Sequence, residues 1–290
     1  MKPIEMKRIL AGIDFSDWTS PVLQTAAVMA QSFSARLTVV HAETFLPPPY
    51  FTRRGMDQIV DMLEVHRDEA RRHLAETVRK EVHGQVRVET RLVEATPAEG
   101  IRMTAAETDP GLIVLGTHGR SGWNRMLLGS VAEKVVREAA APVLTVRGVG
   151  EDKAGCRLPF KRILCPVNYA EVARESLRYA ADLAQRFKSE LIAVIVVEQD
   201  GSESDCVLRE QELRLCDWVT EDVKAVCAFR PVVRRGDPAE QIIRAAAEEG
   251  SDLIVIGAQH RPLLETTIFG TTSVRVLRHS ACPVLTVVRR

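Results

Sequence analysis

The sequence predicts an α/β protein of two tandem doubly wound domains, each a five-stranded parallel sheet with helices on both faces. Short apolar, β-branched segments alternate with amphipathic helical segments, as in parallel sheets joined by crossover helices. The pattern then occurs again. PVLTV at Pro142–Val146 returns letter for letter at Pro283–Val287, and KRILAGID at Lys7–Asp14 returns as KRILCPVN at Lys161–Asn168. A repeat this long indicates duplicated domains.

The first half contains the segments expected of five strands and their connecting helices. Lys7–Asp14 is an apolar strand that ends in an acid, and Ser16 or Asp17 is placed to cap the helix that follows. The other elements follow from the same periodicities. Further strands are expected at Leu37–His41, Val86–Val93, Leu112–Leu115 and Pro142–Val146, and helices at Asp57–Val82, from Pro97 to about Glu107, and at Ser130–Ala140.

The second half repeats these elements with a deletion. EQDGSESD at Glu198–Asp205 replaces the proline-rich loop and long helix of the first half. Gly148–Phe160 is polar and contains glycine, as linkers do. We therefore expect domains at residues 1–147 and 161–290, joined by a linker at residues 148–160.

Composition and charge narrow the classes of function. The chain has 290 residues, with 39 Lys and Arg against 39 Asp and Glu, so no net field attracts nucleic acid or an anionic membrane. No apolar run approaches the ~18 residues that span a bilayer, and no signal region precedes the first strand. The six cysteines lack zinc-type spacing, which favours reduced thiols. We expect a soluble, cytoplasmic protein without nucleic-acid or membrane partners.

A glycine-rich segment, GTHGRSGWNRMLLGS at Gly116–Ser130, follows the fourth expected strand and opens a helix. Gly116 and Gly119 let backbone amides approach a ligand without a Cβ in the way. The helix start at Gly129 and Ser130 offers unpaired N–H groups and the positive end of the helix dipole. This arrangement is typical of phosphate sites in α/β proteins.

Charged residues near this segment have two interpretations each. His118, Arg120 and Arg125 are candidates for screening phosphate charge, although basic residues are common on any surface. Asp14 would meet Gly116 at one crevice if the first and fourth strands are neighbours. Asp14 also fits the simpler role of an acid at a helix start.

The spacing Gly116-x-x-Gly119, nine residues, then Gly129-Ser130 resembles the signature of the ATP-binding branch of the universal stress protein family. The resemblance covers both halves, and it implies a strand order of 3-2-1-4-5 in each. It further implies ATP bound with Mg²⁺ or Mn²⁺, with Asp14 on the ribose side and adenine near Ala42. The residues implied to bind the phosphates are Gly116, Gly119, Gly129 and Ser130.

The resemblance also implies pairing through the last strands of the two domains. In tandem members the two halves pair with each other, here through Pro142–Val146 and Pro283–Val287. A homodimer of whole chains is a further expectation.

The second half departs from the family pattern in two places. Asn168 replaces Asp14, and His260 occupies the position of Gly119. A side chain at 260 obstructs the close approach that glycine permits, and asparagine carries no charge to help hold a cation. The outer positions persist as Gly257, Gly270 and Thr271. We expect a degenerate second site that serves pairing or a separate ligand.

The same features leave two other hypotheses open, a slow ATPase or nucleotide hydrolase and an interaction scaffold in which nucleotide is incidental. The sequence lacks a Walker motif and a nucleophile elbow. Asp14 is the one credible general base at the site, and we assign no catalytic residue. We therefore favour a stress-response regulatory protein whose first domain binds ATP.

Overall fold

The computed structural model describes residues 3–44, 53–83, 86–117, 128–147, 159–197, 205–258, 261–263, 266–268 and 270–288. The first half alternates strand and helix as its periodicity predicts. Its elements are β1 (Arg8–Ile13), α1 (Thr19–Phe33), β2 (Arg36–Glu43), α2 (Arg53–Glu81), β3 (Val88–Glu94), α3 (Pro97–Thr108), β4 (Leu112–Gly116), α4 (Ser130–Glu138) and β5 (Val143–Val146).

The second half follows the same order with additions. Its elements are β6 (Arg162–Val167), α5 (Glu171–Phe187), β7 (Glu190–Val197), α6 (Asp205–Trp218), α7 (Glu221–Lys224), β8 (Ala228–Arg235), α8 (Pro238–Glu248), β9 (Leu253–Ala258), β10 (Arg261–Leu263), β11 (Thr266–Ile268), α9 (Thr271–His279) and β12 (Val284–Val288).

One local expectation about the second half is wrong. The deletion shortens the helix between the second and third strands but does not remove it, since α6 has 14 residues where α2 has 29. The shorter helix still covers the sheet, because Leu215 on α6 is buried in the core. Two strands not expected from the sequence, β10 and β11, pair antiparallel and lie in the chain between β9 and α9, where the first half carries its glycine-rich segment.

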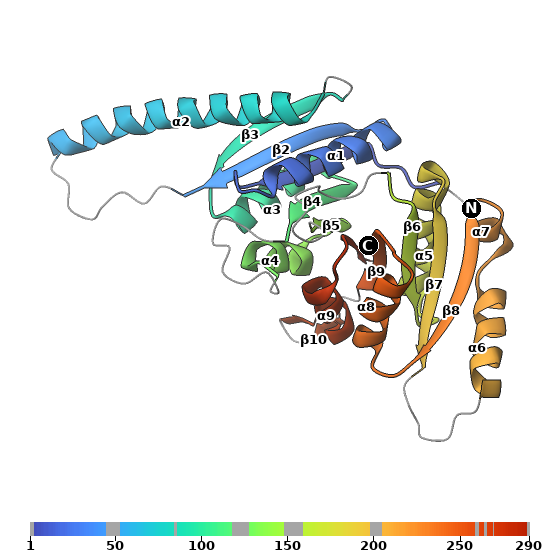
Figure 1. Ribbon diagram of the computed structural model, residues 1–290. Helices are drawn as coiled ribbons and strands as arrows, with labels where there is room; N and C mark the ends of the chain where they lie inside the picture. Colours follow the sequence, from blue (N-terminus) through green and yellow to red (C-terminus); the bar gives the residue numbers. More distant parts are fainter. Residues whose placement is uncertain are drawn as a thin grey trace.

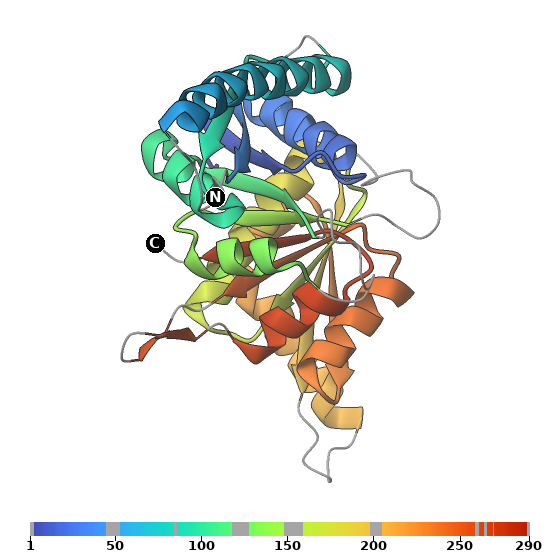
Figure 2. The same ribbon diagram turned by 90° about the vertical axis from the view of Figure 1, so that its left-hand side faces the viewer.

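The two halves share one ten-stranded sheet, with strand order β3-β2-β1-β4-β5-β12-β9-β6-β7-β8 (Figures 1 and 2). Each half therefore has the order 3-2-1-4-5, which confirms the predicted fold. Helices α1, α2, α5 and α6 pack on one face of the sheet, and α3, α4, α8 and α9 pack on the other. Within the described residues, no helix is both long and apolar enough to cross a membrane.

The halves meet at β5 and β12, the strands that carry the repeated PVLTV segment. These strands pair antiparallel, with Leu144 opposite Leu285, its counterpart in the repeat. Equivalent residues face each other, so the pairing is isologous, as at a two-fold axis. Side chains beside the strands add to this contact. Arg278 lies 2.9 Å from the Glu133 carboxylate, and Arg147 donates to the carbonyl oxygen of Ser280.

Candidate functional site

A cavity of about 550 Å³, the first-half cavity, lies at the carboxyl ends of β1, β2 and β4. These ends lie together because β1 pairs in parallel with both neighbours, Ile13 beside His41 and Gly12 beside Leu115. The starts of α1, α3 and α4 complete the lining. Small-molecule pockets are typically ~300–1,000 Å³, so this cavity has room for a ligand of that class.

Five of the candidate site residues line this cavity: Asp14, Ala42, Gly116, Gly129 and Ser130. The structure thus brings together the end of β1, the end of β2 and the two described ends of the glycine-rich segment. The candidates that lie outside the described residues are His118, Gly119, Arg120, Arg125 and His260.

The start of α4 faces the first-half cavity. Gly129 is its extended N-cap residue, and no described side chain caps the helix. The amide of Gly129 donates to the carbonyl of Thr117 at 2.7 Å, which holds the helix start beside the end of β4. Ser130 and Val131 belong to the first turn and line the cavity. The unpaired N–H groups of that turn and the helix dipole favour a negative ligand group.

Asp14 organises the turn between β1 and α1. Its Oδ1 accepts hydrogen bonds from the Ser16 amide at 3.1 Å and from the Ser16 hydroxyl at 2.6 Å. The turn holds Phe15 at a φ of 59°, a conformation uncommon for a residue with a Cβ. The expected cap at Ser16 or Asp17 is wrong, because α1 begins at Thr19 with Trp18 at its N-cap position. The hydroxyl of Ser16 donates to Asp14 and accepts from the amide of Trp18 at 3.3 Å, one residue before α1 begins.

The rings of Phe15 and His41 pack against each other beside Asp14. The ring of Phe15 lies 4.4 Å from that of His41 and 4.7 Å from that of His73 on α2. His41 is buried, and its Nδ1 lies 2.8 Å from the carbonyl oxygen of Ile13. A carbonyl only accepts, so Nδ1 carries the proton in this contact. The positions of these two rings are therefore fixed by packing and by the hydrogen bond from His41 to β1.

The described lining of the first-half cavity contains the carboxylates of Asp14 and Glu43 and no Lys or Arg. These two negative charges oppose a polyanionic ligand, and a cation bound with it would offset them. Mg²⁺ typically takes one or two protein carboxylates together with phosphate oxygens and water, and Asp14 fits that role. The described residues contain no cluster of three or more His, Cys, Asp or Glu that could hold a metal. The donor set therefore suits a cation that arrives with its ligand.

Thr19 adds a polar atom with an unmet hydrogen bond. This residue lines the first-half cavity and is 7% exposed, and its Oγ1 has no hydrogen-bond partner among the described residues. Leaving a buried hydroxyl unpaired costs about 1–3 kcal/mol.

Both halves match the sequence model of the universal stress protein family, over residues 5–147 and 159–288. The chain belongs to this family. It is 30% identical to a tandem-length universal stress protein of Mycobacterium tuberculosis, over 98% of each chain. It is 36% identical to a shorter member from Thermus aquaticus, over 49% of this chain and 98% of that protein. A universal stress protein structure from Archaeoglobus fulgidus shares the fold, with a TM-score of 0.73 at 20% identity over 99% of this chain and 100% of that one.

The two universal stress protein domains can be compared residue by residue. In the first, Ile13 pairs with His41, and in the second the equivalent Val167 pairs with Ile195. Five polar residues that line the first-half cavity thereby acquire less polar counterparts. Asp14, Thr19, His41, Glu43 and Thr117 correspond to Asn168, Ala173, Ile195, Val197 and Ala258. The second domain keeps the fold and loses most of the polar lining.

The described candidate residues of the second domain have structural roles. Asn168 Oδ1 accepts from the Ala170 amide at 3.3 Å, and Tyr169 keeps a φ of 59°, so the turn after β6 copies the turn after β1. A Cβ on Gly257 would lie 2.9 Å from the Val172 side chain and carbonyl oxygen. That glycine therefore allows α5 to pack against β9. Gly270 is the N-cap residue of α9, and Thr271 is its first residue.

Sequence reasoning missed Trp18, Thr19, His41 and Glu43 as cavity residues. A signal for two of them was present. His41 and Glu43 are polar residues at the end of an apolar strand, and aligning β2 with β7 sets them against Ile195 and Val197. For Trp18 and Thr19 the sequence offered only a helix start.

Proposed function

We propose that the first domain binds ATP together with Mg²⁺ or Mn²⁺ and that the protein is a nucleotide-binding regulatory module of the stress response. The observation that carries the proposal is the polar first-half cavity, which occurs in the domain that has the complete glycine spacing. The phosphates would lie at the start of α4, on Gly129 and Ser130. Asp14 would contact the ribose side and the cation, and adenine would lie near Ala42.

Charge balance supports a nucleotide that carries a cation. Asp14 and Glu43 repel phosphate, while the first turn of α4 attracts it. A divalent ion between Asp14 and the phosphates resolves this opposition. Gly119, His118, Arg120 and Arg125 would close the phosphate side, as the family signature implies.

We assign the second domain a pairing role. Its cavity-lining positions are mostly apolar or small, and its last strand completes the shared sheet beside β5. The described cysteines are free thiols, which agrees with a reducing, cytoplasmic environment.

The proposal is tested by titrating the full chain with Mg·ATP and comparing Asp14→Asn. This change copies Asn168, whose amide oxygen supports the same turn, so the fold should persist while the charge is lost. We expect affinity for Mg·ATP to fall about tenfold, as for one lost charged contact. Asn168→Asp is the matched control and should leave the affinity unchanged. Binding of Mg·ATP that does not respond to Asp14→Asn would contradict the placement of the cation.

A further inference from the structure

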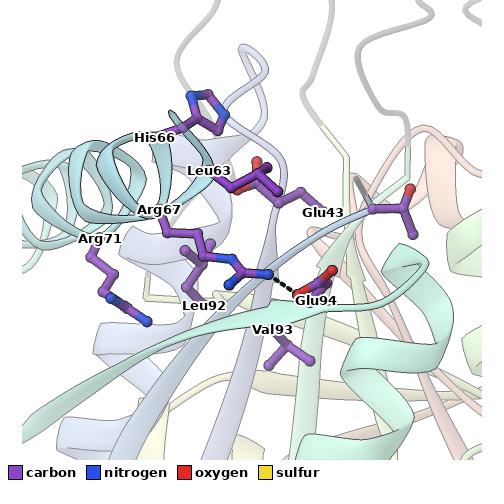
Figure 3. A pocket seen from close by; sticks show the side chains of 9 residues that line it. Glu43, Leu63, His66, Arg67, Arg71, Leu92, Val93 and Glu94 are labelled. Atoms are coloured by element: carbon purple, nitrogen blue, oxygen red, sulfur yellow. Dashed lines mark hydrogen bonds and ion pairs between the residues drawn. The ribbon is translucent and has the colours of Figure 1, made fainter. Parts of the chain in front are cut away.

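A second cavity, of about 260 Å³, lies between α2 and the ends of β2 and β3 (Figure 3). We call it the α2 pocket. The residues that matter for its chemistry are Glu43, Leu63, Arg67, Arg71, Leu92 and Glu94. It adjoins the first-half cavity, with which it shares Glu43 and Thr44, and the rest of its lining is distinct.

The inner face of α2 changes character along its length. Leu74 and Val78 on that face are buried in the core. One and two turns earlier, at helical spacing, the same side carries Arg71 and Arg67. Figure 1 shows that α2 extends beyond the sheet on its N-terminal side. The arginines thus line the α2 pocket where the helix leaves the sheet.

The guanidinium of Arg67 faces into the α2 pocket and is paired with Glu94 (Figure 3). The Arg67 and Glu94 side chains are 38% and 57% exposed, and exposed ion pairs contribute only about 0–1 kcal/mol. Arg71 is paired with Asp68 on its own helix at 2.8 Å. An incoming anion can therefore replace Glu94 at Arg67 with little loss of stability.

Apolar side chains stand beside the arginines. Leu63 on α2 and Leu92 on β3 line the α2 pocket. A cavity of about 150 Å³ is enough to hold benzene, so this larger one accommodates a ring and an anionic group together. The planar fork of arginine matches a carboxylate or a phosphate, with two parallel hydrogen bonds.

We propose that the α2 pocket binds a small organic anion, a carboxylate or phosphate on an apolar body of about one ring. The anionic group engages Arg67 and Arg71 after Glu94 is displaced, and the apolar body packs against Leu63 and Leu92. The site stands apart from the proposed ATP site.

Calorimetry on the full chain without nucleotide tests this site independently of ATP binding. The probes are phenyl phosphate and phenylacetate, with benzyl alcohol and inorganic phosphate as controls that lack the charge or the ring. We expect at least one aromatic anion to bind, and the one that binds identifies the anionic group. Failure of both at millimolar concentration overturns the proposal, as does equal binding of benzyl alcohol.

Two substitutions with opposite expected effects on the affinity for the probe test where it binds. Arg67→Gln should weaken the probe about tenfold, since it removes a charged hydrogen-bond donor. Glu94→Gln should strengthen binding, because it frees Arg67. Arg72→Gln is the matched control, as Arg72 is exposed on the same helix and is not among the pocket residues. The proposed site is wrong if Glu94→Gln leaves the affinity for the probe unchanged, or if Arg72→Gln weakens binding as much as Arg67→Gln does. If Arg67→Gln disturbs the structure of α2, the effect of Glu94→Gln on affinity still tests the site.

Discussion

At the scale of single residues, a comparison of Asp14 with Asn168 distinguishes what the turn needs for its geometry from what the negative charge adds. Asp14 and Asn168 both close the turn after the first strand of their domain, and both accept a backbone amide. Phe15 and Tyr169 follow with the same left-handed φ of 59°. The turn thus needs a side-chain oxygen and not a charge. The negative charge of Asp14 is left for another task, which we assign to the cation.

The buried thiols should resist alkylation. Burial raises the pKa of Cys165 to about 12 and that of Cys282 to about 11, whereas Cys206 is exposed on α6. Alkylation requires the thiolate, which is scarce at any pH below the raised pKa. We expect brief iodoacetamide treatment near neutral pH to modify Cys206 and to spare Cys165 and Cys282, as measured by peptide mass spectrometry. Equal labelling of all three in folded protein would contradict this account.

At the scale of elements, the cavity depends on how closely α3 approaches β2. Gly100 on α3 permits this approach, because a Cβ there would lie 2.5 Å from the Cβ of Ala42. Ala42 lines the first-half cavity, so the same contact sets both packing and site shape.

Gly100→Ala should therefore destabilise the protein although alanine favours helix. Overpacking of this kind costs about 1–3 kcal/mol. Urea unfolding measures the change, and Met103→Ala, at an exposed position on the same helix, is the control. A variant as stable as the parent chain would show that α3 moves freely on the sheet.

The elements that the sequence predicted are those with a repeated pattern. The apolar runs and the recurrence of PVLTV were sufficient for the strands and for the fold class. Three-residue strands such as β10 and β11 are too short to show an alternation, and α6 was hidden by the polar segment before it. Among the site residues, Asp14, Gly116 and Gly129 followed from motif and order. Thr19 lies at the start of α1, and neither its residue type nor its place in the helical pattern distinguishes it as a cavity residue.

At the scale of the whole molecule, a second contact besides the strand pair joins the halves. Asp182 on α5 is buried, accepts the Ile4 amide at 3.3 Å and pairs with Arg186 at 2.7 Å. Arg186 also donates to the carbonyl of Ser32 and lies 4.0 Å over the ring of Phe33. This cluster fixes the N-terminal segment and α1 to the second domain. Because β5 is already paired, a homodimer of whole chains would have to use another surface.

Arg186→Met should lower the free energy of unfolding by more than an ordinary surface substitution does. It leaves the buried Asp182 carboxylate without its partner, and such losses cost about 3–5 kcal/mol. The double variant Asp182→Leu with Arg186→Met should recover much of the stability, since no charge then remains buried. Chemical denaturation of both variants measures the difference. A single variant that matches the double variant in stability would contradict a coupled pair.

We assign nucleotide binding to the first domain alone. The most direct test of this assignment is the stoichiometry of Mg·ATP bound to the intact chain, determined by calorimetry at saturating nucleotide. We predict one tight site per chain, which disappears on removal of the divalent cation. Two equivalent sites per chain, or no binding to folded protein, would contradict this assignment.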